Sequence, residues 1–141
     1  MKVLILEQEK TIRDSLVHLM GGCGCFEVFS AHSRQEGGCL FNSIPFDVIL
    51  CGHKLCDGDG LELLKEFICQ KPGLVSILMT AHSDDLLRQK AAEAGVRGYL
   101  EKPFDLKQLE EAIGMTLSCD VRPSVPLGRD GFFPRRTGKD R

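Results

Sequence analysis

Short apolar runs alternate with helix-length amphipathic patterns along most of this chain, and this alternation constrains the fold more than any other feature. Five such pairs fit, which is typical of repeated βα units and a parallel sheet. Runs such as 3–6 and 75–79 are almost continuously apolar, so we expect helices on both faces of the sheet. The predicted strands are Lys2–Leu6, Phe26–Ser30, Val48–Cys51, Leu74–Met79 and Gly98–Leu100, with helices at 10–20, 34–43, 60–70, 84–94 and 106–118.

Capping residues support several of these helix boundaries, because a side-chain acceptor at the start of a helix satisfies otherwise unpaired amides. Gly21 and Gly95 suit helix ends. The helix at 34–43 is the exception, because Gly37 and Gly38 each cost about 1 kcal/mol of helix propensity relative to alanine. We therefore expect a short or frayed segment there. The predicted caps are Ser33 with Glu36, Asp59 with Glu62, and Asp105 with Gln108.

The chain has 141 residues, 43% of them hydrophobic, which is enough for one globular domain. We assign this domain to residues 1–118. Residues 119–141 are rich in Gly and Pro, with six Arg or Lys against three Asp, and predict a basic tail or linker that is disordered or forms a docking arm. Phe132-Phe133 would anchor such an arm, flanked by Arg135-Arg136.

Composition also limits location and partners. No apolar run approaches the roughly 20 residues that span a bilayer, and the start is too short for a secretory signal, so we expect a cytoplasmic protein. The seven cysteines are then expected to be free thiols. A formal net charge of -2 gives no general attraction to nucleic acid, and the tail cannot build a helix-turn-helix.

Ligands of an open parallel sheet bind beyond the carboxyl ends of the strands, where the winding direction reverses. The residues expected at that edge are Glu7-Gln8 after the first strand, Gly52 after the third, Thr80-Ala81 after the fourth and Lys102-Pro103 after the fifth.

Four motifs in this order resemble the receiver domains of bacterial response regulators over residues 1–118. They are Leu-Glu-Gln-Glu at 6–9, the block 47–60, Met-Thr-Ala at 79–81 and Tyr-Leu-Glu-Lys-Pro-Phe at 99–104. The resemblance implies a flavodoxin-like, doubly wound (βα)5 three-layer sandwich with a five-stranded parallel sheet in the order 2-1-3-4-5. It also implies a site in which an acidic pair and an aspartate at position 52 hold Mg²⁺. That aspartate accepts a phosphoryl group, Thr80 and Lys102 contact its oxygens, and Tyr99 is the switch aromatic.

The residues that depart from this pattern include those that would accept the phosphoryl group and bind Mg²⁺. Gly52 replaces the acceptor and has no side chain with which to attack a phosphoryl donor. Gln8 replaces an acid, which leaves Glu7 as the one carboxylate at the matched positions, so we predict weak or absent Mg²⁺ binding. Cys56 stands where proline is common. Because Lys102 has lost its anionic neighbour, we hypothesise an ion pair between Glu7 and Lys102 that fills the pocket.

Three functions follow. The leading one is a degenerate receiver, not an enzyme, that acts as a phosphorylation-independent protein-interaction module in signal transduction. The second is an active receiver that uses Asp57 as a substitute acceptor. The third is a redox or metal sensor built on Cys51-x-His53-x-x-Cys56 or Cys23-x-Cys25. Strand alternation should aim His53 away from the pocket if the strand extends that far, and we prefer to interpret it as a partly exposed loop histidine.

Thr80 and Tyr99 fit two interpretations equally: a surviving switch, or a strand-end hydroxyl and an apolar ring at the sheet edge. The resemblance places the contact surface for signalling partners, and for a plausible homodimer, on the fourth helix, fifth strand and fifth helix. Residues of that surface include Leu86, Leu87, Arg88, Lys90 and the helix from Leu106.

Overall fold

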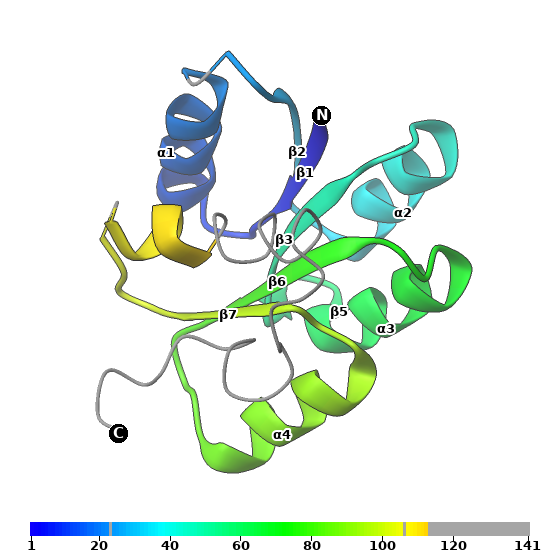
Figure 1. The fold of residues 1–141 in the computed structure, drawn as a ribbon, viewed down its shortest axis with the longest axis vertical. Coiled ribbons are helices and arrows are strands. Elements are labelled where there is room, and N and C mark those ends of the chain that lie inside the picture. Colours follow the sequence, from blue (N-terminus) through cyan, green and yellow to red (C-terminus); the bar gives the residue numbers. More distant parts are fainter. Residues whose placement is uncertain (23, 106, 113–141) are drawn as a thin grey trace, which may run out of the picture.

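The computed structural model describes residues 1–22, 24–105 and 107–112, which form a five-stranded parallel sheet between two layers of helices (Figure 1). The sheet order is β2-β1-β3-β6-β7. Counting only these parallel strands along the chain, this is the predicted order 2-1-3-4-5. The strands are β1 (Lys2–Leu6), β2 (Glu27–Ala31), β3 (Val48–Gly52), β6 (Val75–Thr80) and β7 (Gly98–Glu101).

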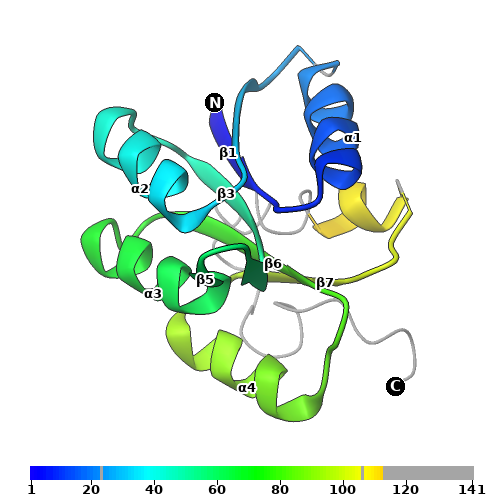
Figure 2. The same cartoon turned by 180° about the vertical axis from the view of Figure 1, so that it is seen from behind.

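Helices cover both faces of the sheet, which confirms the three-layer sandwich. On one face lie α1 and the helical residues 107–112, and on the other lie α2, α3 and α4 (Figures 1 and 2). None of the helices in the described ranges is long and apolar enough to cross a membrane. The predicted tail at 119–141 and the end of the last predicted helix lie outside the described residues. The helices are α1 (Lys10–Gly21), α2 (Arg34–Ser43), α3 (Gly60–Gln70) and α4 (Asp85–Ala94).

Each face of the sheet has its own hydrophobic core. Along β1, Val3 and Ile5 pack toward α1, while Leu4 and Leu6 pack toward α2 and α3, and all four are fully buried. Burying one such side chain contributes roughly 1.5–3 kcal/mol. The continuous apolarity of this strand is therefore explained by burial on both faces.

The three predicted N-cap residues each accept a hydrogen bond from a backbone amide in the first turn that follows. Asp105 and Gln108 cap each other reciprocally, with the Gln108 amide 2.8 Å from the Asp105 carboxylate and the Asp105 amide 3.0 Å from the Gln108 side chain. Ser33 accepts from the Glu36 amide. The sequence interpretation missed one N-cap, Asp84, which precedes α4. Its carboxylate accepts a hydrogen bond from the Leu87 amide.

The expectation of a short second helix is wrong, because α2 continues through both glycines to Ser43. Gly37 is buried, and a Cβ at that position would overlap the side chain of Leu6. The glycine therefore lets α2 approach the sheet closely, and this packing outweighs the loss of helix propensity.

An antiparallel hairpin that was not predicted follows β3. It consists of β4 (Lys54–Leu55) and β5 (Gly58–Asp59). Between them, the Asp57 carboxylate accepts hydrogen bonds from the Arg34 amide at 2.7 Å and the Gln35 amide at 3.1 Å. The hairpin is thereby fastened to the start of α2, beside the carboxyl edge of the sheet.

Candidate functional site

The carboxyl ends of four strands converge on one pocket, as the parallel topology requires. Its volume is about 210 Å³. Four of the predicted residues line it, and Glu7 and Gly52 lie buried next to Lys102 and His53. The sheet therefore brings six of the seven predicted residues together, and Pro103 is the one that does not line this pocket. The lining residues are Gln8, Glu9, His53, Lys54, Met79, Thr80, Ala81, His82 and Lys102.

An ion pair joins Glu7, directly after β1, to Lys102, directly after β7. The Lys102 Nζ lies 2.9 Å from Glu7 Oε1 and 3.6 Å from Glu9 Oε1. Glu7 is fully buried, while the Lys102 side chain keeps 16% of its surface exposed. The second Glu7 oxygen accepts a hydrogen bond from the Glu9 amide. The predicted Glu7–Lys102 pair is confirmed, and it gives a buried carboxylate a counter-charge.

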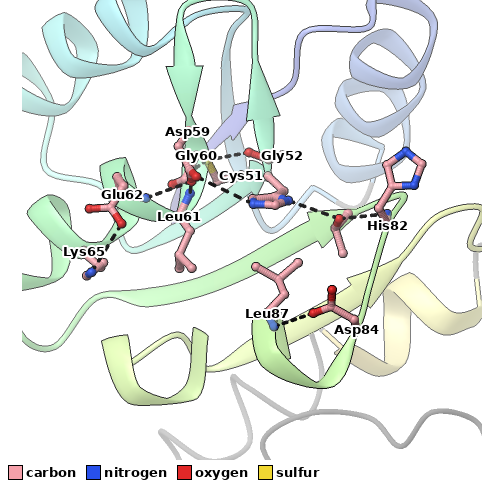
Figure 3. Close-up of polar contacts among 12 residues, drawn as sticks. Cys51, Gly52, Asp59, Gly60, Leu61, Glu62, Lys65, His82, Asp84 and Leu87 are labelled. Carbon is pink, nitrogen blue, oxygen red and sulfur yellow. Dashed lines mark hydrogen bonds and ion pairs between the residues drawn. The ribbon is translucent and has the colours of Figure 1, made fainter. Parts of the chain in front are cut away.

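Gly52 ends β3 against this ion pair. A Cβ at position 52 would lie 3.1 Å from Glu7 Oε1, so the glutamate occupies the space that a side chain of residue 52 would enter. On its other side, Gly52 faces Gly60, the first residue of α3, where a Cβ would overlap the Gly52 carbonyl oxygen (Figure 3). Strand and helix meet here backbone to backbone, which leaves no room for a side chain at position 60, whereas a side chain at position 52 would need Glu7 to shift.

The described donors do not fit Mg²⁺, the metal that the resemblance implies for this pocket. Mg²⁺ prefers carboxylates and water in near-octahedral geometry. Here Lys102 lies next to both nearby carboxylates, Glu7 and Glu9. Gln8 is neutral and Gly52 contributes no ligand. Among the residues that the structure describes, no group of three or more His, Cys, Asp or Glu side chains could hold a metal ion.

Thr80, at the end of β6, is buried and faces the pocket. Its hydroxyl accepts a hydrogen bond from the His82 amide at 3.1 Å and lies 3.5 Å from His53 Nδ1. The hydroxyl thus satisfies a backbone group of the loop before α4. This is the structural role that was one of the two interpretations of Thr80.

Strand alternation was expected to aim His53 away from the pocket only if the strand extended that far, and it does not. His53 is the partly exposed histidine outside the strand that was the preferred prediction, and it lines the pocket, with Nε2 3.8 Å from the Asp59 carboxylate on the other side of the ring. The reason is that β3 ends at Gly52. The His53 amide then bonds the Met79 carbonyl as the chain turns into the hairpin, so the alternation of the strand does not continue. The position of His53 directly after a strand that ends at the site was a signal for this placement.

Tyr99 is buried in β7 and linked to α4. Its hydroxyl lies 2.8 Å from Ser83 Oγ, and the Arg88 guanidinium stacks 4.4 Å from the ring centroid. Arg88 in turn contacts Glu101 at 3.1 Å. Burial raises the pKa of Tyr99, so the hydroxyl stays neutral and can donate or accept a hydrogen bond. The sequence interpretation missed Ser83, which completes this contact.

The exposure of each side chain shows which residues of the predicted partner surface a protein could contact. Leu86 is 59% exposed, and Lys90 is exposed on the same helix. Leu87 is instead a core residue, 8% exposed, so it cannot contribute to a docking surface. Arg88 is half-buried against Tyr99, and Leu106 lies outside the described residues.

Asp57, the alternative acceptor, already has a structural partner. Its two amide hydrogen bonds, chiefly the one from Arg34, lower the pKa of its carboxyl. The carboxylate is thus directed to the start of α2.

Among the cysteines that the structure describes, none forms a metal-binding group with His53. Cys51 is fully buried in the core, where its Sγ donates to the Gly52 and Gly60 carbonyls and burial raises the pKa of the thiol. Cys56 is exposed, with its Sγ 3.7 Å from the His32 carbonyl. Cys25 is also exposed and Cys23 lies outside the described residues. A buried, protonated thiol is a poor nucleophile and a poor metal ligand.

Comparison with known proteins gives a consistent result. The family model of the response regulator receiver domain matches residues 3–114. The KDP operon transcriptional regulatory protein KdpE of Escherichia coli K12 is 32% identical over 124 residues, which are 88% of this chain and 54% of KdpE. The transcriptional regulatory protein ZraR of Salmonella typhimurium LT2 is 28% identical over 116 residues, 82% of this chain and 26% of ZraR.

The chain therefore spans about half the length of KdpE and about a quarter of ZraR. Among solved structures, a CheY-like response regulator receiver domain protein from Methanospirillum hungatei JF-1 superposes with a TM-score of 0.80 at 26% identity. The match covers 86% of this chain and 97% of that one.

Proposed function

This chain belongs to the response regulator receiver family, and we propose that it is an atypical receiver that acts as a protein-interaction module in signal transduction without being phosphorylated. The observation that carries this proposal is the buried Glu7–Lys102 ion pair beside Gly52. It supports a pocket whose charges are balanced internally.

Phosphoryl transfer to a receiver needs a nucleophile aligned with the donor and positive charge directed at the phosphoryl oxygens. Gly52 supplies no nucleophile. Lys102, which would supply the charge, lies 2.9 Å from a carboxylate that has no exposed surface. The proposed receiver is therefore inactive for two separate reasons, one covalent and one electrostatic.

Metal binding is proposed to be weak or absent for the same electrostatic reason. A divalent cation would have to displace Lys102 from Glu7 and Glu9 before it could use either carboxylate. We expect the midpoint of thermal unfolding to stay unchanged when Mg²⁺ is raised to about 10 mM, because a ligand that binds only the native state must stabilise it. A clear rise in this midpoint would show that the pocket still takes the metal.

A receiver that is not phosphorylated needs another source of free energy to change its state. In this proposal a protein partner supplies it by binding one conformation more tightly than the other. The surface formed by α4, β7 and residues 107–112 is suited to this, since Leu86 and Lys90 are exposed beside the Tyr99–Ser83 contact. A second copy of the chain is one such partner, and sedimentation at micromolar concentration measures whether it binds.

Labelling with a small phosphodonor tests the proposal. The full chain is incubated with acetyl phosphate and Mg²⁺, beside an active receiver as a control for the donor, and intact mass is measured. We expect the control to gain one phosphoryl group and this chain to gain none. If the chain is labelled, the proposal fails, and loss of the label in Asp57→Asn would identify Asp57 as the substitute acceptor.

A further inference from the structure

A second and larger cavity adjoins the pocket described above, between α1 and the segment from Lys102 to Leu109. Its volume is about 580 Å³, within the range of ligand-binding cavities. The elements on its two sides lie next to each other in both views of the fold (Figures 1 and 2). We call it the α1 cavity. The apolar residues that line it are Ile12, Leu16, Leu19, Ala81, Pro103, Phe104 and Leu109.

The charges around the α1 cavity favour a cationic ligand. Glu9 and Asp105 line it and are exposed. The one lining cation, Lys102, is shared by Glu7 and Glu9. Together, Glu7, Glu9 and Lys102 carry one net negative charge, and Asp105 adds a second. A ligand with an apolar body and positive charges beside it would match both the wall and the rim.

The chain itself contains such a segment. Residues 132–136 read Phe-Phe-Pro-Arg-Arg, two aromatic rings followed closely by two guanidinium groups. Arginine binds carboxylates through a planar fork of donors, and buried phenylalanine rings contribute large apolar areas. The chemistry that the α1 cavity selects is therefore present in the same molecule.

The connection also allows the contact. The described residues end at Ala112, three positions after Leu109, which lines the α1 cavity. Residues 113–132 can span up to about 70 Å when extended, far more than a return to this face requires. A tethered segment acts at an effective concentration in the millimolar range, so a weak intrinsic affinity suffices for occupancy.

We propose that residues 132–136 dock into the α1 cavity of the same molecule, with the two phenylalanine rings against the apolar wall and the arginines at Glu9 and Asp105. The docked segment covers the exposed side of α1 and competes with any protein that binds there. This contact does not depend on the proposed loss of phosphorylation, because it involves neither Gly52 nor a phosphodonor.

Photo-crosslinking of the full chain tests this contact. Phe133 is replaced by p-benzoylphenylalanine, the sample is irradiated at low micromolar concentration, and crosslinked peptides of the monomer are mapped by mass spectrometry. We expect crosslinks to peptides that contain residues 12–19 or 103–109. Ser15→Trp, which fills the α1 cavity from an exposed position, should lower the yield at least fivefold, whereas Glu93→Trp on α4 should not change it.

A second variant, Arg135→Glu/Arg136→Glu, reverses the charge of the segment and changes no residue that the structure describes. It should lower the yield of the intramolecular crosslink at least threefold. Crosslinks that map to another face would overturn the proposal, as would a yield that neither the cavity variant nor the charge variant changes. Crosslinks between two molecules would assign the α1 cavity to a second copy and would overturn the intramolecular contact.

Discussion

The two halves of the site differ in what they retain of the receiver pattern. The acceptor half, formed by Glu7, Gly52 and Lys102, has an ion pair where the resemblance implies an aspartate and a metal. The switch half, formed by Thr80, Ser83 and Tyr99, keeps its hydroxyls in contact with the loop before α4. These contacts join β6 and β7 to the loop that precedes α4, and Thr80 also lies 3.5 Å from His53 Nδ1. The comparison teaches that this half can be held in place without a carboxylate at position 52.

Removing the cation of the acceptor half should have the largest effect. Lys102→Met leaves Glu7 fully buried without its counter-charge, and breaking a buried ion pair in this way costs about 3–5 kcal/mol. Urea denaturation at pH 7 measures the free energy of unfolding. Glu7→Gln/Lys102→Met, in which both charges are removed, should recover most of the loss. A double variant as unstable as the single one would show that packing, and not charge, holds this half together.

Adding a carboxylate to the acceptor half should have the next largest effect. Gly52→Asp places a charge beside Glu7, whereas Gly52→Asn adds the same bulk without charge. We expect the Asp variant to be about 1–3 kcal/mol less stable than the Asn variant at pH 7, because the new carboxylate lacks a partner of its own. Equal stabilities in urea would indicate that Lys102 pairs with both carboxylates. The acceptor half could then accommodate an aspartate at position 52.

Removing one hydroxyl from the switch half should have a smaller effect. Tyr99→Phe loses the contact with Ser83 Oγ, at a cost of about 1 kcal/mol, and Ser83→Ala should cost a similar amount. Combining Tyr99→Phe with Lys102→Met tests the independence of the two halves. We expect the two costs to add within about 0.5 kcal/mol in denaturation experiments. A larger deviation would mean that the halves are coupled and that the comparison above is too simple.

The smallest expected effect concerns the hairpin that leads away from the acceptor half. The native pKa of Asp57 is lowered below its ordinary 3.8 by amide hydrogen bonds. Its carboxylate therefore stabilises the fold above that value, and the contribution disappears as the pH falls through the native pKa. Wild type should be more stable than Asp57→Asn at pH 7, and the difference should shrink toward about pH 3. A difference in unfolding midpoint that does not change with pH would exclude this role.

The sequence predicted the elements of the sheet well, for a physical reason. Strands buried on both faces are marked by apolar runs, and β1 was predicted at its observed bounds. The ion pair was predictable too, because a lysine that loses one carboxylate next to the strand ends can reach another, and Glu7 was the nearest in the pattern.

What the sequence could not provide depends on contacts between distant residues. Gly37 was interpreted through helix propensity, but its contact with Leu6 comes from the packing of α2 on β1. The orientation of His53 depends on a hairpin of two-residue strands, too short to show any periodicity. Asp57 caps a helix that begins 23 residues earlier in the chain, a distance that no local capping pattern covers.

The close approach of Glu7 to Gly52 has an evolutionary consequence. An aspartate introduced at position 52 would place its Cβ 3.1 Å from Glu7 Oε1, and Gln8 would still be neutral. A phosphoryl-accepting site at this edge of the sheet would thus need several coordinated substitutions. Under the proposed function, a single mutation at position 52 would not create an active receiver, and natural selection would have no one-step route to that activity.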